Sequence, residues 1–143
     1  MRENLSTMSF KRANLFYWIL RILAAIIMLQ TLYFKFSGAE ESVYIFSKLG
    51  MEPWGRIGIG IIELVASLLL LVPRTTAVGA MLGLGVIGGA IFFHLTRLGI
   101  VVQSDHGQLF IYALLVFISC AILAWSFKRQ LLDFLTPEFD DHF

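Results

Sequence analysis

The stretch GIGIIELVASLLLLVPR, residues 58–74, decides the fold of this chain, because it is a membrane span in every respect except for the carboxylate of Glu63 at its centre. The whole chain has 143 residues, of which 58% are hydrophobic and 15% charged, and its mean hydropathy is +0.80. The apolar residues gather in long blocks and do not alternate with polar ones. This composition is typical of an integral membrane protein.

Four apolar segments approach or meet the roughly 20 residues that a helix needs to cross a bilayer core. Lipid offers the backbone no hydrogen-bond partner, and these runs lack the alternation of barrel strands, so each is predicted to be a helix. The predicted fold is all-α: one domain, residues 1–143, built as an integral membrane four-helix bundle. The spans are expected at about residues 15–34, 57–72, 77–95 and 109–127, with an acidic tail at residues 136–143.

The connection between the first two spans carries helix signals of its own. Ser37 and Glu40 have the spacing of a capping box, and Gly50 is placed to end a helix. Apolar residues recur between them at helical spacing. We therefore expect a short amphipathic helix at the outer membrane interface; an ordinary extracytoplasmic loop is the alternative.

The distribution of basic residues predicts the orientation. Cytoplasmic segments of membrane proteins carry more Lys and Arg than external ones, which places both termini of this chain in the cytoplasm. The basic residues expected inside are Arg2, Lys11, Arg12, Arg74, Lys128 and Arg129, and those expected outside are Lys35, Lys48, Arg56 and Arg97.

Several classes of function are excluded by what the sequence lacks. Cys120 is the single cysteine, so no intrachain disulfide and no dithiol centre can form. The net charge of +1 without a dense basic stripe gives no support to nucleic-acid binding. His94, Asp105 and His106 are metal-ligand types, but they lack the spacing of a metal motif, so no metal site is expected.

The third span is rich in glycine. Gly79 and Gly83 are four residues apart, as are Gly85 and Gly89, and small residues at this spacing let helix backbones approach closely in lipid. We expect them to pack within one chain, although a homo-oligomer could use the same pattern.

Two ionisable residues, Arg21 and Glu63, lie inside apolar runs. Such a group at mid-bilayer costs ~2.5–3.5 kcal/mol on insertion scales, so both are predicted to face the bundle interior. At 1.5 Å per residue, Arg21 lies about 10 Å and Glu63 about 15 Å from the inner ends of their spans. We therefore predict an Arg21–Glu63 ion pair. Three roles stay open: the pair only fixes helix register, Glu63 handles a proton or substrate, or burial keeps Glu63 protonated.

A second polar cluster is expected nearer the outer surface. Lys35, His94, Gln108 and Tyr112 fall at similar depth on three spans and are predicted to line a pocket. The imidazole of His94 can both donate and accept a proton, which suits proton exchange with a bound quinol or a transported solute. A histidine that is merely hydrogen-bonded is the simpler alternative.

Five motifs together resemble the DoxX-like family of small four-helix membrane proteins. They are LYFKFSGAEE (32–41), F-x-x-L-G (46–50), R-x-G-x-x-x-x-E-L (56–64), LLLLVPRTTAVGA (68–80) and GAIFFHLTRLG (89–99). The resemblance covers roughly residues 15–127. It implies a bacterial inner-membrane protein with a quinone-linked or accessory redox role, and it supplies no settled catalytic residues.

The function expected from these observations is a small subunit or accessory factor of quinone-linked membrane redox metabolism. Such a protein would have no catalytic activity of its own, with a quinone as its one candidate cofactor. A non-enzymatic assembly factor that binds a membrane or peripheral protein, and a transporter of small solutes or protons, are the alternatives.

Overall fold

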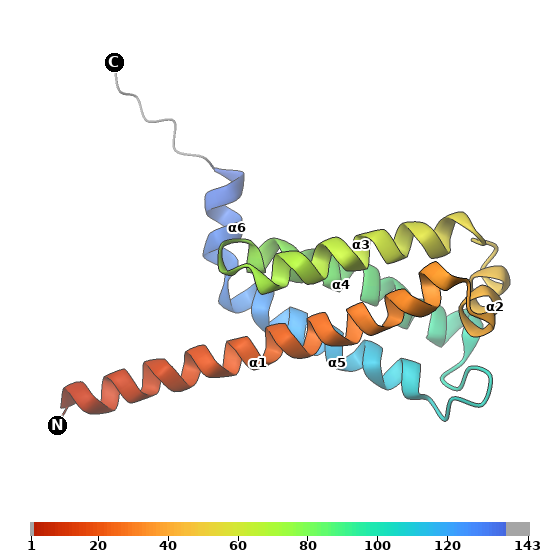
Figure 1. The fold of residues 1–143 in the computed structure, drawn as a ribbon. Coiled ribbons are helices and arrows are strands. Elements are labelled where there is room, and N and C mark those ends of the chain that lie inside the picture. The colour runs from red at the N-terminus through yellow and green to blue at the C-terminus, as the bar shows by residue number, and fades with distance from the viewer. Residues whose placement is uncertain (1, 137–143) are drawn as a thin grey trace, which may run out of the picture.

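The computed structural model describes residues 2–136, with side chains from residue 4, and shows helices and turns without strands in that range (Figure 1). The predicted all-α fold is therefore confirmed. The helices are α1 (Arg2–Ser37), α2 (Glu40–Lys48), α3 (Trp54–Leu71), η1 (Pro73–Thr75), α4 (Thr76–Phe93), the π-helical segment η2 (His94–Leu98), α5 (Gln108–Ser126) and α6 (Lys128–Leu135).

Four segments are long and apolar enough to cross a membrane, and they correspond to the four predicted spans. They are Asn4–Ser37, Trp54–Leu71, Pro73–Leu98 and Gln108–Ser126. Helix α1 packs on α3 and α5, and α4 packs on the same two helices, so the spans form a closed ring in the order α1, α3, α4, α5. The short α2 contacts α1, α3 and η2 and thus covers one end of the ring.

Helix α1 is much longer than the predicted span. Its N-terminal part extends beyond the other spans, as Figure 1 shows in red. Residues from Asn4 to Phe16 in this part are exposed, and they include two basic side chains, Lys11 and Arg12. Helix α1 therefore begins well outside the bundle that the four spans form.

Glycines end both α1 and α2. Gly38 has φ = +68° and Gly50 has φ = +71°, and the residue after each donates its N–H to a carbonyl five residues earlier, as in a Schellman motif. The prediction for Gly50 is confirmed. The predicted capping box is wrong: Ser37 belongs to α1, and the N-cap of α2 is Ala39, which makes no side-chain cap.

Helices α3 and α4 approach each other closely at Gly79. A Cβ atom built on Gly79 would lie 2.6 Å from the backbone N of Leu70 and 2.9 Å from the backbone O of Ala66. On Gly83 it would lie 2.7 Å from Sγ of Cys120 on α5. These two glycines let three helices meet around a core that includes Met28, Leu70, Val116, Cys120 and Leu123.

Helix α6, which the sequence analysis did not predict, packs at the end of the bundle where the turn between α3 and α4 lies. Gln130 of α6 donates from Nε2 to the carbonyl O of Pro73 at 2.7 Å and accepts from the N–H of Ala77 at 3.2 Å. One side chain thus ties α6 to the turn between α3 and α4. The predicted acidic tail lies, apart from Thr136, outside the described residues.

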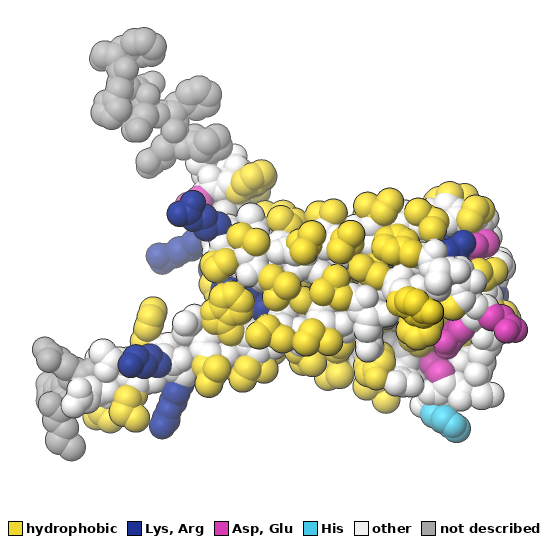
Figure 2. Space-filling view, viewed as in Figure 1, with side chains coloured by type: hydrophobic (Ala, Val, Ile, Leu, Met, Phe, Trp, Pro, Cys, Tyr) yellow, Lys and Arg dark blue, Asp and Glu magenta, His cyan; other side chains and the backbone are white. Residues whose placement is uncertain are grey.

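The surface of the bundle is divided into zones (Figure 2). Hydrophobic side chains cover its middle, Lys and Arg gather at the end that carries α6 and the start of α1, and acidic side chains gather at the opposite end. Exposed aromatic residues also lie near both ends, with Trp125 at the first and Tyr33 and Trp54 at the second. Aromatic side chains of this kind favour the headgroup regions of a bilayer.

Candidate functional site

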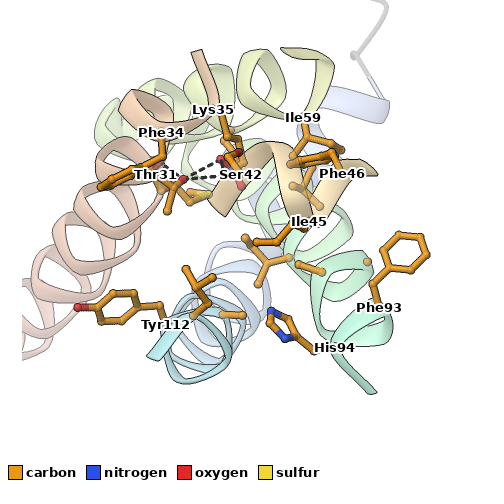
Figure 3. A pocket seen from close by; sticks show the side chains of 18 of the residues that line it. Thr31, Phe34, Lys35, Ser42, Ile45, Phe46, Ile59, Phe93, His94 and Tyr112 are labelled. Carbon is orange, nitrogen blue, oxygen red and sulfur yellow. Dashed lines mark hydrogen bonds and ion pairs between the residues drawn. The ribbon is translucent and has the colours of Figure 1, made fainter. Parts of the chain in front are cut away.

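A cavity of about 560 Å³ lies in the half of the bundle that α2 covers. The cavity is lined by residues of all four spans and of α2 and η2, so it lies between the spans. Figure 3 shows side chains of α1, α2 and η2, among them Phe34, Ile45 and His94, around this space. Most of the lining is apolar, with polar groups at a few positions, which is the usual character of a small-molecule site.

Two glycines of α4 create much of this space. Gly85 and Gly89 line the cavity, and a Cβ atom built on either would meet nothing within 4 Å. Gly85 and Gly89 therefore leave space for the cavity, whereas Gly79 lets two helices pack closely. The prediction of close packing is confirmed for the first glycine pair and wrong for the second.

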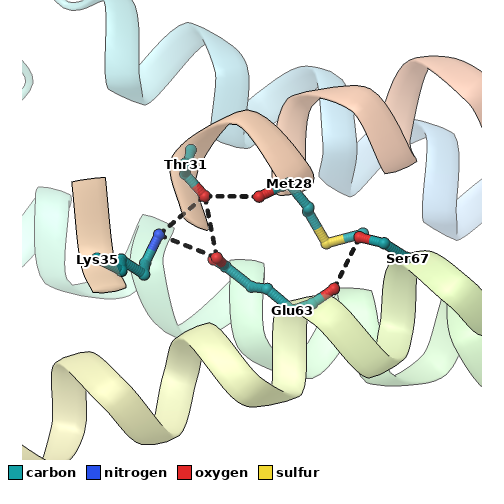
Figure 4. Close-up of polar contacts among 5 residues, drawn as sticks. All are labelled: Met28, Thr31, Lys35, Glu63 and Ser67. Atoms are coloured by element: carbon teal, nitrogen blue, oxygen red, sulfur yellow. Dashed lines mark hydrogen bonds and ion pairs between the residues drawn. The ribbon is translucent and has the colours of Figure 1, made fainter. Parts of the chain in front are cut away.

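Glu63 lies in the cavity wall, and its partner is Lys35. Nζ of Lys35 lies 2.9 Å from Oε2 of Glu63, and the two side chains are 13% and 5% exposed. Thr31 completes the cluster: its hydroxyl lies 3.0 Å from the same carboxylate oxygen and 2.9 Å from Nζ of Lys35 (Figure 4). The Thr31 hydroxyl is also 2.8 Å from the carbonyl O of Met28, and since it carries one proton it donates to one of these acceptors at a time.

The predicted Arg21–Glu63 ion pair is wrong. Arg21 precedes Thr31 by ten residues on the same helix, which is about 15 Å at 1.5 Å per residue, and it lies at the other end of the bundle. The prediction measured depth from the presumed inner ends of the spans, whereas α1 extends past the end of α3. Measuring depth from the ends of the apolar runs therefore placed Arg21 and Glu63 at similar depths, although they lie at different depths in the bundle.

His94 reaches the cavity through a change of helix type. The last α-helical residue of α4 is Phe93, and residues 94–98 form a π-helical turn, a feature often found at functional sites. The His94 side chain is buried, Nδ1 lies 2.8 Å from the carbonyl O of Gly99, and the ring packs edge-on against Phe110. Because a carbonyl only accepts, Nδ1 must carry a proton, which leaves Nε2 of the neutral ring as an acceptor.

Asp105 holds the loop between η2 and α5. Its carboxylate accepts hydrogen bonds from the backbone N–H groups of Val102, Gly107 and Leu109 at 2.9, 2.9 and 3.1 Å. Partial burial acts to raise the pKa of Asp105, but these three hydrogen bonds and the nearby His94 outweigh it and hold the pKa below its ordinary value. Asp105 also lines the cavity, so the loop that it organises forms part of the wall.

Several residues that line the cavity are exposed, most of them on α1 and α5. They are Gln30 and Phe34 of α1, Gly85 of α4 and Gln108 of α5, and Tyr112 of α5 is half-buried. Nε2 of Gln108 donates to the hydroxyl of Tyr112 at 2.7 Å. An amphipathic molecule in the bilayer could enter sideways here.

The four residues predicted to form an outer pocket, Lys35, His94, Gln108 and Tyr112, all line this cavity. Sequence reasoning missed Thr31, although its position four residues before Lys35 places it on the same face of the helix. It also missed the contribution of α2, whose buried Ser42 and Phe46 lie in the wall. Among the described residues no cluster of three or more His, Cys, Asp or Glu side chains could hold a metal ion.

Comparison with known proteins identifies a family that this chain matches. Residues 19–124 match the model of a family described as DoxX-like. No curated protein and no solved structure matches the chain. The matched range runs from α1 into α5 and so contains all the cavity-lining residues.

Proposed function

This chain belongs to the DoxX-like family of membrane proteins, and we propose that it is a small multi-pass subunit or accessory factor of quinone-linked redox metabolism. The cavity in its outer half is the binding site for the quinone head group. The observation that carries the proposal is that one space collects a histidine, a Lys–Glu pair and a Gln–Tyr pair and also has exposed wall residues on the neighbouring spans α1 and α5.

The size and character of the cavity fit such a ligand. Binding pockets for small molecules commonly enclose about 300–1,000 Å³ with mostly apolar walls, and this cavity of about 560 Å³ lies within that range. A quinone head group is a flat ring with polar oxygens on opposite edges, and its isoprenoid tail stays in the lipid. The opening beside Phe34 and Tyr112 would let the tail leave the cavity into the bilayer.

The polar residues of the cavity supply both kinds of hydrogen-bond partner. Lys35 and the amide of Gln108 are donors for carbonyl oxygens, whereas neutral His94 offers Nε2 as an acceptor for a hydroxyl proton. When bound, a quinone supplies two-electron redox chemistry coupled to protons. The protein would hold the ring and give or take a proton at His94.

We assign this protein to the inner membrane of a bacterium, with both termini in the cytoplasm. Two of the four basic residues on the opposite side, Lys35 and Arg56, are mostly buried and form ion pairs with Glu63 and Glu52. When these two paired residues are set aside, the excess of basic side chains at the end with α6 is larger than the sequence alone suggests. This excess favours a cytoplasmic position for that end. Cysteine labelling from either side of the membrane, at Ser9 and at Ser104, would test the orientation.

The binding proposal is tested by thermal unfolding of the purified protein with a short-tailed quinone. The expected result is a higher melting temperature for the wild type, with most of the increase lost in His94→Ala and in the cavity-filling Gly89→Leu. His106→Asn changes an exposed histidine in the nearby loop and should respond as the wild type does. An alkyl chain without the quinone ring serves as the ligand control.

Two results would contradict the proposal. One is a melting temperature that the quinone does not change. The other is an equal increase with the alkyl chain alone, because the cavity would then recognise only a hydrophobic tail.

A further inference from the structure

Arg21 is a buried cation whose charge no carboxylate among the described side chains, residues 4–136, balances. It is 4% exposed, and its Nε has no hydrogen-bond partner. The ion pairs of the described residues are Lys35–Glu63 and Glu52–Arg56, so no carboxylate there reaches the guanidinium. Its neighbours are aromatic: Cζ lies 4.5 Å from the ring centroid of Trp18 and 4.9 Å from that of Phe127.

A groove of about 190 Å³ lies beside this cation, at the end of the bundle opposite the large cavity. It is lined by Phe10, Ala13, Asn14 and Tyr17 of α1 and by Phe127. Phe127 is thus shared, because its ring contacts both Tyr17 and Arg21.

The helix geometry directs Arg21 toward the groove. Phe10, Asn14, Tyr17 and Arg21 follow one another at spacings of four, three and four residues, so they lie along one face of α1. Long side chains on a helix lean toward its N-terminus, and the contact of Arg21 with Trp18, three residues earlier, agrees with this direction. The guanidinium therefore lies against the ring of Phe127, which also forms part of the groove wall.

The surroundings favour an anion that has an apolar part. Four exposed basic residues, Lys11, Arg12, Lys128 and Arg129, belong to this end of the molecule, where Figure 2 shows the Lys and Arg side chains. Exposed Trp125, against which Lys128 packs at 4.1 Å, marks the depth of the lipid headgroups. Basic pockets between spans on the cytoplasmic side are suited to anionic lipid headgroups.

We propose that Arg21 and the groove beside it bind an anionic phospholipid of the leaflet on the side of the termini. The guanidinium takes the phosphate through its planar set of N–H donors, and Asn14 offers a second polar contact. Phe10, Tyr17 and Phe127 pack against the apolar part of the lipid. This site is independent of the quinone proposal, because it lies at the other end of the bundle and shares no residue with the cavity.

The experiment measures thermal unfolding of the full chain in a neutral detergent with added phosphatidylglycerol or with phosphatidylcholine of the same acyl chains. Native mass spectrometry of the same samples measures the lipid that stays bound. The variants are Arg21→Gln and, as a matched control, Arg74→Gln, which removes an exposed arginine from the same end. Inorganic phosphate is added in a separate series.

The expected result is that phosphatidylglycerol raises the melting temperature of the wild type and of Arg74→Gln more than phosphatidylcholine does. Arg21→Gln should lose this difference and bind phosphatidylglycerol about tenfold more weakly. Without lipid, Arg21→Gln should melt no lower than the wild type, because the substitution removes an unpaired buried charge. Asn14→Leu narrows the groove at an exposed position and should also weaken binding while Arg21 remains.

Three results would overturn the proposal. The first is an equal effect of phosphatidylglycerol on the wild type and on both groove variants. The second is a melting temperature of Arg21→Gln that is lower by the same amount in every lipid, since Arg21 would then be only a packing residue. The third is stabilisation by inorganic phosphate that depends on Arg21, which would make the ligand a soluble anion.

Discussion

Replacing Glu63 with glutamine should destabilise the protein by about 3 kcal/mol, because Lys35 would be left in the cavity wall without its anion. The magnitude follows from the burial of the pair, whose side chains are 13% and 5% exposed, and from the 2.9 Å contact between them. Loss of one partner of a buried ion pair costs ~3–5 kcal/mol. The lower end applies here, since Lys35 keeps its contact with Thr31 and glutamine still offers an acceptor oxygen.

The assay is a double-mutant cycle in mixed detergent micelles. It measures the free energy of unfolding for the wild type, Glu63→Gln, Lys35→Met and the double variant. We expect each single change to be damaging, the double variant to recover much of the loss, and a coupling energy of about 2 kcal/mol. A second cycle pairs Glu63→Gln with Arg21→Gln, whose effects should add within ~0.5 kcal/mol because the residues lie far apart.

The reasoning would be refuted by a coupling energy below ~0.5 kcal/mol between Lys35 and Glu63. It would equally be refuted by strong coupling between Glu63 and Arg21. That outcome would mean that α1 and α3 pack in a different register from the one described.

Three further predictions concern other parts of the fold. Gly79→Ala should lower the free energy of unfolding by ~1–3 kcal/mol, because its Cβ would meet the backbone of α3, whereas Gly89→Ala should be neutral or stabilising; chemical unfolding of both compares them. The lowered pKa of Asp105 contributes stability that is present above its ordinary value of 3.8 and is lost as the pH falls through the lower folded value. The difference in melting temperature between the wild type and Asp105→Asn should therefore stay constant above about pH 5 and shrink at lower pH; a difference that grows toward low pH would contradict this. Gln130→Leu should increase hydrogen exchange at the N–H of Ala77, which loses its partner, and unchanged exchange there would show that α6 does not hold the turn.

The sequence was sufficient to predict the four spans, because the length and apolarity of a membrane helix are set by the bilayer and not by its neighbours. The candidate pocket could also be anticipated. Lys35, His94, Gln108 and Tyr112 are polar groups near the ends of apolar runs, and the simplest way to keep such groups out of lipid is to turn them toward one another.

The pairing inside the bundle was harder to predict. Lys35 and Arg21 are both cations on α1, and the choice between them depends on how far α1 slides past α3, which no local pattern records. Gly89 resembles Gly79 in sequence, yet one borders a cavity and the other a helix crossing. Only the distance to the neighbouring helix separates these cases, and that distance is a property of the whole fold.

The two glycine pairs of α4 affect different properties of the fold, and this separation bears on how the protein can change by mutation. Gly79 and Gly83 determine whether the helices assemble, whereas Gly85 and Gly89 determine how much room the cavity has. A change at the second pair alters the shape available to a ligand without disturbing any packed contact. Single substitutions at Gly85 or Gly89 can therefore change the shape of the cavity, while the helix packing around it stays the same.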